Sequence, residues 1–328
     1  MVGSYVTGIL PRPNKLVEAT RAYERGKMRE EDLERFFIKA SDEVIRFQVK
    51  TELSYVTDGM LKWQDLLRPF TDSLKGVERG TLTRWFNNNV FYRKPIITGR
   101  VSREHAVVPK YSYLDLLPKK VPWKAILPAP YTFAQLSDNR FYEDKLELMF
   151  EYAEVLREEL KELTTLGFKY FQLSDPSLVY RPVEGKMPKD ELEFVKDALK
   201  KTVKGVSAKI CLQTFFGDFN NILPEALEFP VDHLGIDLYE TDIKSLKEYE
   251  FDKGVALGMV DSRSSLIEEV DELVSIAKDL IESIYPSKIR EVFICPNCDL
   301  EFLPWERAKA KIEVVSRVAK ALEVSLSG

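Results

Sequence analysis

The sequence predicts an α/β fold, and within that class a single-domain (β/α)8 TIM barrel spanning residues 1–328. Short apolar segments, several of them β-branched, alternate with longer segments of helical periodicity, a pattern typical of parallel βαβ units. No glycine-rich phosphate loop follows any of the apolar segments. This second observation disfavours the alternative, a doubly wound open sheet with a dinucleotide site.

Nine segments are expected to form strands, one more than a barrel needs. They are residues 4–10, 53–59, 95–101, 123–130, 169–176, 208–215, 233–239, 254–261 and 291–297. Residues 95–101 follow a polar, aromatic-rich loop, so we expect them to form an extra hairpin outside the barrel, between the early strands. Apolar residues spaced by three and four predict helices, most clearly over 33–47, 146–163 and 308–322.

Composition excludes several classes of protein. Lysine and arginine number 48 against 53 aspartates and glutamates, so the chain lacks the basic excess of a nucleic-acid-binding protein. No apolar stretch reaches 18 residues, and the first residues do not resemble a signal peptide, so we expect no membrane span. Three cysteines are too few for a disulfide framework, which favours a cytoplasmic location.

Several segments at the expected strand ends resemble the cobalamin-independent methionine synthase family. "GILPRP" is similar to the family's Gly-x-x-Pro-Arg opening, and "YFQLSDPSLVY" to its Gln-Ile-Asp-Glu-Pro-Ala-Leu segment. "ICPNCDLEFLPWE" resembles the closing strand with its Pro-Asp-Cys-Gly-Leu, and "CLQTFFGDFNNILPEA" matches a further block. The resemblance extends from about residue 5 to 320 and keeps the order of every block.

Full-length members of that family contain two related barrels. The C-terminal barrel binds zinc and transfers a methyl group from methyltetrahydrofolate polyglutamate to homocysteine, a step of methionine biosynthesis. The N-terminal barrel lacks the metal and helps to hold the folate tail. "LTRWFNNNVFY" resembles the N-terminal barrel, whereas "KPIITGRVS" is closer to the catalytic one. The chain is therefore identified as a single-barrel member, most similar to the metal-free half.

The resemblance places the family's zinc ligands, His-x-Cys, Glu and Cys, at Gln213, Phe215, Asp237 and Cys298. Zinc in a catalytic site needs soft ligands and one open position for the substrate thiolate. Only Asp237 and Cys298 carry suitable donor groups, so the expected ligand set is incomplete. For Cys298, a functional thiol and a packed side chain remain alternatives.

The positions that hold homocysteine in the family also differ in this chain. Ile9, Met60 and Ser174 stand where the family has a serine, a glutamate and an aspartate. An isoleucine and a methionine cannot bind the ammonium and carboxylate groups of an amino acid.

Two further groups of residues are candidates for substrate binding or chemistry. The resemblance implies that Arg12, Lys15 and Arg84 bind the polyglutamate tail, because arginine binds carboxylates through paired hydrogen bonds. Asp58, Ser174 and Gln213 are expected to line the substrate mouth. Carboxylates crowded at this mouth would raise each other's pKa values, which suits general acid or base catalysis. Asp175 and Asp237, together with Cys298, are therefore the tentative catalytic residues.

These expectations lead to three hypotheses about function. The first is a folate-binding, auxiliary barrel that works with a separate zinc-bearing catalytic chain in methyl transfer to homocysteine. The second is a self-sufficient methyltransferase with an altered donor or acceptor that uses Asp237 and Cys298. The third is a small-molecule binding protein that performs no chemistry.

Overall fold

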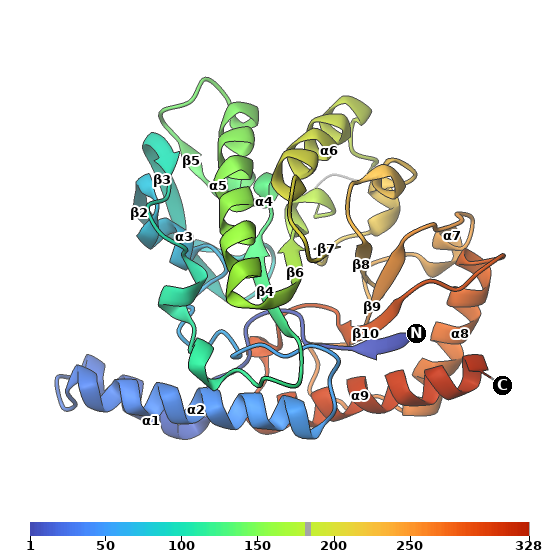
Figure 1. Cartoon of the computed structure of the whole chain (residues 1–328), viewed down its shortest axis with the longest axis horizontal. Coiled ribbons are helices and arrows are strands. Elements are labelled where there is room, and N and C mark those ends of the chain that lie inside the picture. Colours follow the sequence, from blue (N-terminus) through green and yellow to red (C-terminus); the bar gives the residue numbers. More distant parts are fainter. Residues whose placement is uncertain (181–184, 328) are drawn as a thin grey trace.

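The computed structural model describes residues 1–180 and 185–327. At its centre lies a curled sheet of seven parallel strands with helices around it (Figure 1). The strand order is β1-β10-β9-β8-β7-β6-β4. These strands are β1 (Val2–Ser4), β4 (Trp123–Pro128), β6 (Phe168–Ser174), β7 (Lys209–Gln213), β8 (His233–Asp237), β9 (Gly254–Val260) and β10 (Val292–Pro296).

The two edges of this sheet, β1 and β4, are bridged by residues 54–57. The backbone N–H of Ser54 donates to the carbonyl of Ser4 at 2.8 Å, and Lys124 N–H donates to the Val56 carbonyl at 2.9 Å. The full strand predicted for 53–59 is therefore wrong in extent, since only an isolated bridge between Val56 and Trp123 forms. The segment still takes the eighth place of the barrel, so the TIM-barrel prediction is confirmed.

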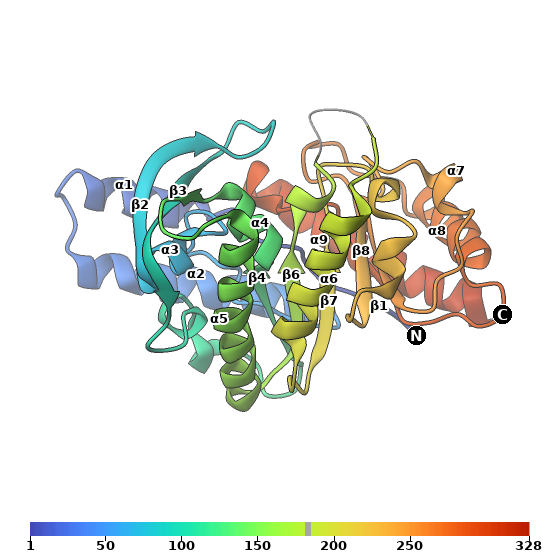
Figure 2. The ribbon, with the colours of Figure 1, turned by 90° about the horizontal axis from the view of Figure 1, so that it is seen from above.

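A long antiparallel hairpin lies outside the barrel, as predicted. It consists of β2 (Lys75–Arg84) and β3 (Phe91–Ser102), and β3 also pairs with the short β5 (Asp138–Asn139). Figure 2 shows it as a curved ribbon along one side of the molecule. The sequence predicted only part of β3, because β2 is largely exposed and polar and gives no apolar signal.

Nine helices belong to the described part of the chain. They are α1 (Asn14–Glu24), α2 (Glu30–Lys50), α3 (Arg68–Ser73), α4 (Pro130–Leu136), α5 (Lys145–Leu166), α6 (Lys189–Val203), α7 (Ile243–Leu246), α8 (Val270–Ile284) and α9 (Trp305–Ser327). The clearest predicted helices coincide with α2, α5 and α9. Helix α5 is capped at both ends. The Asp144 side chain accepts from Glu147 N–H at 2.8 Å at its start, and Gly167 ends the helix with φ 112°.

The interior of the barrel is filled by side chains. Tyr5, Tyr170, Cys211 and Cys295 belong to a buried cluster contributed by β6, β7, β10 and the residue after β1. The Lys124 ammonium group lies 3.3 Å from the centre of the Tyr5 ring, and burial lowers its pKa to about 7. The barrel is therefore a packed core and leaves the C-terminal strand ends as the place for a site.

None of the described helices is long and apolar enough to cross a bilayer.

Candidate functional site

Asp175 lies directly after β6 and is fully buried at the C-terminal face of the barrel. The Thr132 hydroxyl, from α4, donates to Asp175 Oδ1 at 2.6 Å, whereas Oδ2 has no hydrogen-bond partner in the described structure. Burial raises the pKa of this carboxyl group to about 7, although the hydrogen bonds from Thr132 oppose the rise. A carboxyl group with such a pKa can give or take a proton near neutral pH.

Asp237, the last residue of β8, has a different environment. Its Oδ2 accepts from Phe216 N–H at 3.1 Å, and its Oδ1 accepts from Tyr239 N–H at 3.0 Å and from Asn297 Nδ2 at 3.2 Å. Burial still raises its pKa to about 6. Both oxygens are thus occupied in holding together the loops that follow β7, β8 and β10.

The residues at the zinc positions do not fit a zinc ion. Phe215 has no donor atom and is buried, and the amide of Gln213 lies over the Cα of Gly235. The oxygens of Asp237 are used by the three donors above. Cys298 is fully buried, and its backbone carbonyl accepts from the hydroxyls of Thr7 and Ser262. Among residues 1–180 and 185–327, no group of three or more His, Cys, Asp or Glu side chains is placed to hold a metal.

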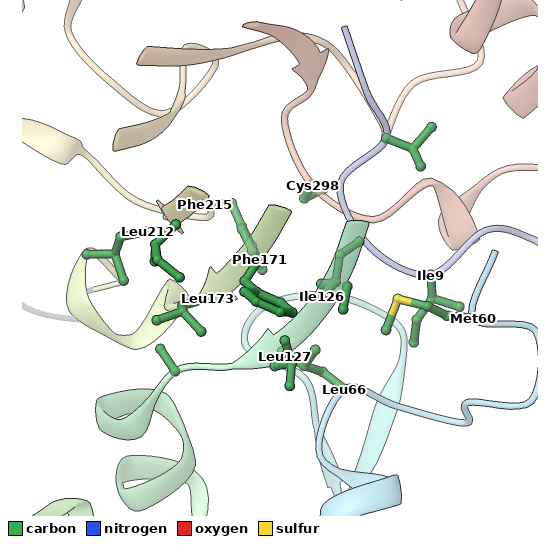
Figure 3. Close-up of a cluster of buried hydrophobic side chains, with 14 of the residues drawn as sticks. Ile9, Met60, Leu66, Ile126, Leu127, Phe171, Leu173, Leu212, Phe215 and Cys298 are labelled. Carbon is green, nitrogen blue, oxygen red and sulfur yellow. The ribbon is translucent and has the colours of Figure 1, made fainter. Parts of the chain in front are cut away.

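Two of the family's homocysteine positions now carry apolar side chains that lie together. Figure 3 shows Ile9 and Met60 side by side, and the backbone N–H of Leu10 donates to the carbonyl of Gly59 at 3.0 Å. Both residues are buried in the main hydrophobic core. Ser174, at the third position, accepts a hydrogen bond from Gln172 Nε2 at 2.9 Å.

A cavity of about 1030 Å³ opens between α1, α2, the β2–β3 hairpin and the loops after β1 and β10. Arg12 lines it, donates to the Leu61 carbonyl at 2.9 Å and lies 5.2 Å from the centre of the Phe37 ring. Burial lowers the pKa of Arg12, whereas the nearby Glu301 and Glu24 raise it. The structure therefore places one predicted tail-binding cation in a cavity large enough for a cofactor-sized ligand.

The other predicted tail-binding residues lie elsewhere. Lys15 and Arg84 are exposed, on α1 and at the end of β2, and neither lines this cavity. Asp58 is buried and accepts from Met60 N–H at 3.0 Å, so it shapes the turn after residues 54–57. Burial raises the pKa of Asp58. The structure thus brings together fewer of the predicted binding residues than the resemblance implies.

Four charged residues around the cavity were not predicted from the sequence. Asp65 and Arg68 form an ion pair at 3.6 Å, and both are buried. Asp299 lies in the loop after β10, and Glu301 lies in the short 3-10 helix that comes next, Leu300–Phe302. The sequence signal for the last two is their place after a parallel strand, because the loops that follow such strands lie at the C-terminal face.

The comparisons with known proteins agree with this architecture. The sequence matches the family described as "Cobalamin-independent synthase, Catalytic domain" over residues 1–321. The chain belongs to this family of cobalamin-independent methionine synthases. A methionine synthase from Saccharolobus solfataricus is 30% identical over 312 residues, which cover 94% of this chain and 90% of that protein. One from Sulfolobus acidocaldarius is 26% identical over 310 residues, with 94% and 88% covered.

Solved structures show the same fold. A B12-independent methionine synthase from Shewanella sp. W3-18-1, in complex with selenomethionine, superposes with a TM-score of 0.81 at 18% identity. The match covers 99% of this chain and 98% of that one. The matching family description is that of the catalytic domain, so the finer likeness to the metal-free half stays a prediction.

Proposed function

We propose that this chain is an auxiliary barrel in methyl transfer from methyltetrahydrofolate polyglutamate to homocysteine. In this proposal it binds the folate for a separate chain that carries zinc. One observation supports it above all: both oxygens of Asp237 are engaged by amide groups, and Phe215 supplies no ligand atom beside it. A barrel of this family with such residues has kept its fold without a zinc ligand set.

The large cavity supports the folate part of the proposal. It combines aromatic walls, among them Phe37 and Trp63, with the guanidinium groups of Arg12 and Arg68. Arg68 Nε is buried and has no hydrogen-bond partner in the described structure. An aromatic heterocycle would pack against the rings, and a carboxylate would accept from the guanidinium groups.

The folate proposal is tested by titrating the chain with methyltetrahydrofolate triglutamate. Arg12→Gln is expected to weaken binding by about tenfold or more, which is the typical loss of one charge-assisted hydrogen bond. Lys15→Gln is the matched control, because Lys15 lies nearby on the exposed face of α1. Equal losses in the two variants, or no binding by the unmodified chain, would contradict a folate site in this cavity.

The auxiliary role is tested by metal content and by partnership. After dialysis against zinc, mass spectrometry is expected to find far less than one zinc per chain. Chains that co-purify with this protein from its source cells are then assayed for methyl transfer with and without it. Stoichiometric, tightly held zinc would overturn the proposal, as would a zinc-bearing partner whose turnover does not change.

A second candidate function is supported by Asp175. Its pKa of about 7 and unpartnered Oδ2 are suited to proton transfer in a self-sufficient enzyme. That candidate predicts turnover by the isolated chain, lost in Asp175→Asn and, if the thiol takes part, in Cys298→Ala. Ligand affinity without any turnover would instead favour a binding protein.

A further inference from the structure

A second, smaller cavity of about 260 Å³ adjoins the large one at the C-terminal face of the barrel. Three carboxyl groups line it, those of Asp65, Asp299 and Glu301, together with the aromatic rings of Trp85 and Phe91. Within the described ranges, no lysine or arginine lines this space. The larger cavity, by contrast, has both arginines and lysines in its walls. The small cavity shares Asp65, Phe91 and Glu301 with the larger one, but its own walls are anionic and aromatic.

The hydrogen bonds of these carboxyl groups leave acceptor atoms free. Asp65 is satisfied, since it accepts from Leu67 N–H at 2.9 Å and Arg93 N–H at 3.2 Å. Asp299 is only 7% exposed; its Oδ1 accepts from Ile9 N–H at 2.8 Å, and its Oδ2 accepts from no described group. Glu301 takes part in no hydrogen bond or ion pair with any described residue. Asp299 Oδ2 and the Glu301 carboxyl group therefore remain available as acceptors toward the cavity, where they can meet a positively charged group.

The electrostatic environment of Glu301 favours the approach of a positive charge. Burial, followed by the charges of Asp299 and Asp65, raises the pKa of Glu301 to about 8, and only Arg12 lowers it. Arg68 forms its ion pair with Asp65 and does not line the small cavity. A bound positive charge would lower this pKa and favour the ionised carboxylate.

We propose that this smaller cavity binds a small organic cation, an alkylated ammonium or sulfonium ion. Its charge would lie against Asp299 and Glu301, and its alkyl groups would contact the faces of Trp85 and Phe91. Aromatic rings attract such ions through their quadrupole, and alkylated cations lose less hydration than a bare ammonium ion when they enter a partly apolar space. This proposal does not depend on the auxiliary role, although Asp65, Phe91 and Glu301 line both cavities.

The chemistry of the walls favours an organic cation over other ligands. An anion would meet three carboxyl groups and no basic side chain. A calcium or magnesium ion needs six or more oxygen ligands, and the ring faces of Trp85 and Phe91 supply none. A neutral apolar molecule would leave the free oxygen of Asp299 without a donor.

The test compares choline with 3,3-dimethyl-1-butanol, its uncharged isostere, in calorimetric titrations of the full chain at pH 7.5. We expect saturable one-to-one binding of choline and at least tenfold weaker binding of the isostere. Trimethylsulfonium is expected to bind like choline. Equal binding of the charged and uncharged compounds, or no binding of either cation, would overturn the proposal.

Variants locate the site within the chain. Glu301→Gln and Asp299→Asn are each expected to weaken choline binding by about tenfold, and Phe91→Leu by about threefold, as typical of one charge partner and one cation–π contact. Glu313→Gln, exposed on α9 and remote from both cavities, is the matched control and should bind like the parent chain. Phe91 is itself 47% exposed, so its variant is expected to fold even if a carboxyl variant does not. Unchanged affinity in a folded Phe91→Leu or Glu301→Gln variant would refute this placement.

Discussion

Replacing Asp175 with asparagine should stabilise the protein at alkaline pH. The pKa of Asp175 rises from 3.8 to about 7 on folding because the carboxyl group is fully buried. Such a raised pKa favours the protonated form in the folded state. The group therefore leaves the free energy of unfolding unchanged below pH 3.8 and lowers it most above pH 7. From the linkage relation this cost reaches roughly 4 kcal/mol at pH 8.5 but only about 1 kcal/mol at pH 4.5.

An asparagine at position 175 removes this pH-dependent cost and can still accept from the Thr132 hydroxyl. Relative to the parent chain, its free energy of unfolding should therefore rise by roughly 3 kcal/mol between pH 4.5 and pH 8.5. Urea titrations of both proteins at the two pH values measure this difference directly. Asp138→Asn, a substitution in the exposed Asp138–Arg140 ion pair, is the control and should show no comparable gain. A stability difference between parent and Asp175→Asn that does not vary with pH would refute the reasoning.

Two further predictions concern the other tentative catalytic residues, and a third concerns bound metal. Asp237→Ala leaves two backbone N–H groups and the Asn297 amide without their acceptor, so it should lower the free energy of unfolding by roughly 3 kcal/mol or more, and Asp237→Asn by less. A chelator should leave the stability of the parent chain unchanged, whereas a lower urea midpoint would indicate a bound metal. Cys298 is fully buried and its pKa is well above the usual value for a thiol, so iodoacetamide should modify it only in denaturant. Mass spectrometry of tryptic peptides measures the extent of modification. Rapid labelling of Cys298 in the native protein would contradict the prediction.

The fold could be predicted from the sequence because its signals are local. Parallel strands buried on both faces appear in the sequence as short apolar runs. The helices that cover them are recognised by apolar residues spaced three and four apart. The strand at 53–59 was over-predicted, since its pairing with β1 and β4 depends on how the barrel closes and not on its own residues. Strand β2 was missed for the opposite reason, because an exposed strand stabilised by its hairpin partner needs no apolar pattern.

The site was less predictable because it depends on which polar atoms meet. The sequence placed Asp175, Asp237 and Cys298 at strand ends, and the structure has all three there. It could not reveal that Asp237 is surrounded by amide donors, since Phe216, Tyr239 and Asn297 come from three separate loops. Nor could it show that Lys15 and Arg84 lie away from the cavity that Arg12 lines.

The contrast between Asp175 and Asp237 separates the candidates for function from the residues that hold the barrel together. Asp237 has a donor for each oxygen and an evident structural task, the joining of three loops. Asp175 has a single side-chain donor, from Thr132, and an oxygen without a partner. A residue that lowers stability without an evident structural task is expected where function has retained it. The Asp237 position therefore serves the fold, and a search for chemistry at this face of the barrel should begin at Asp175 and around the two cavities.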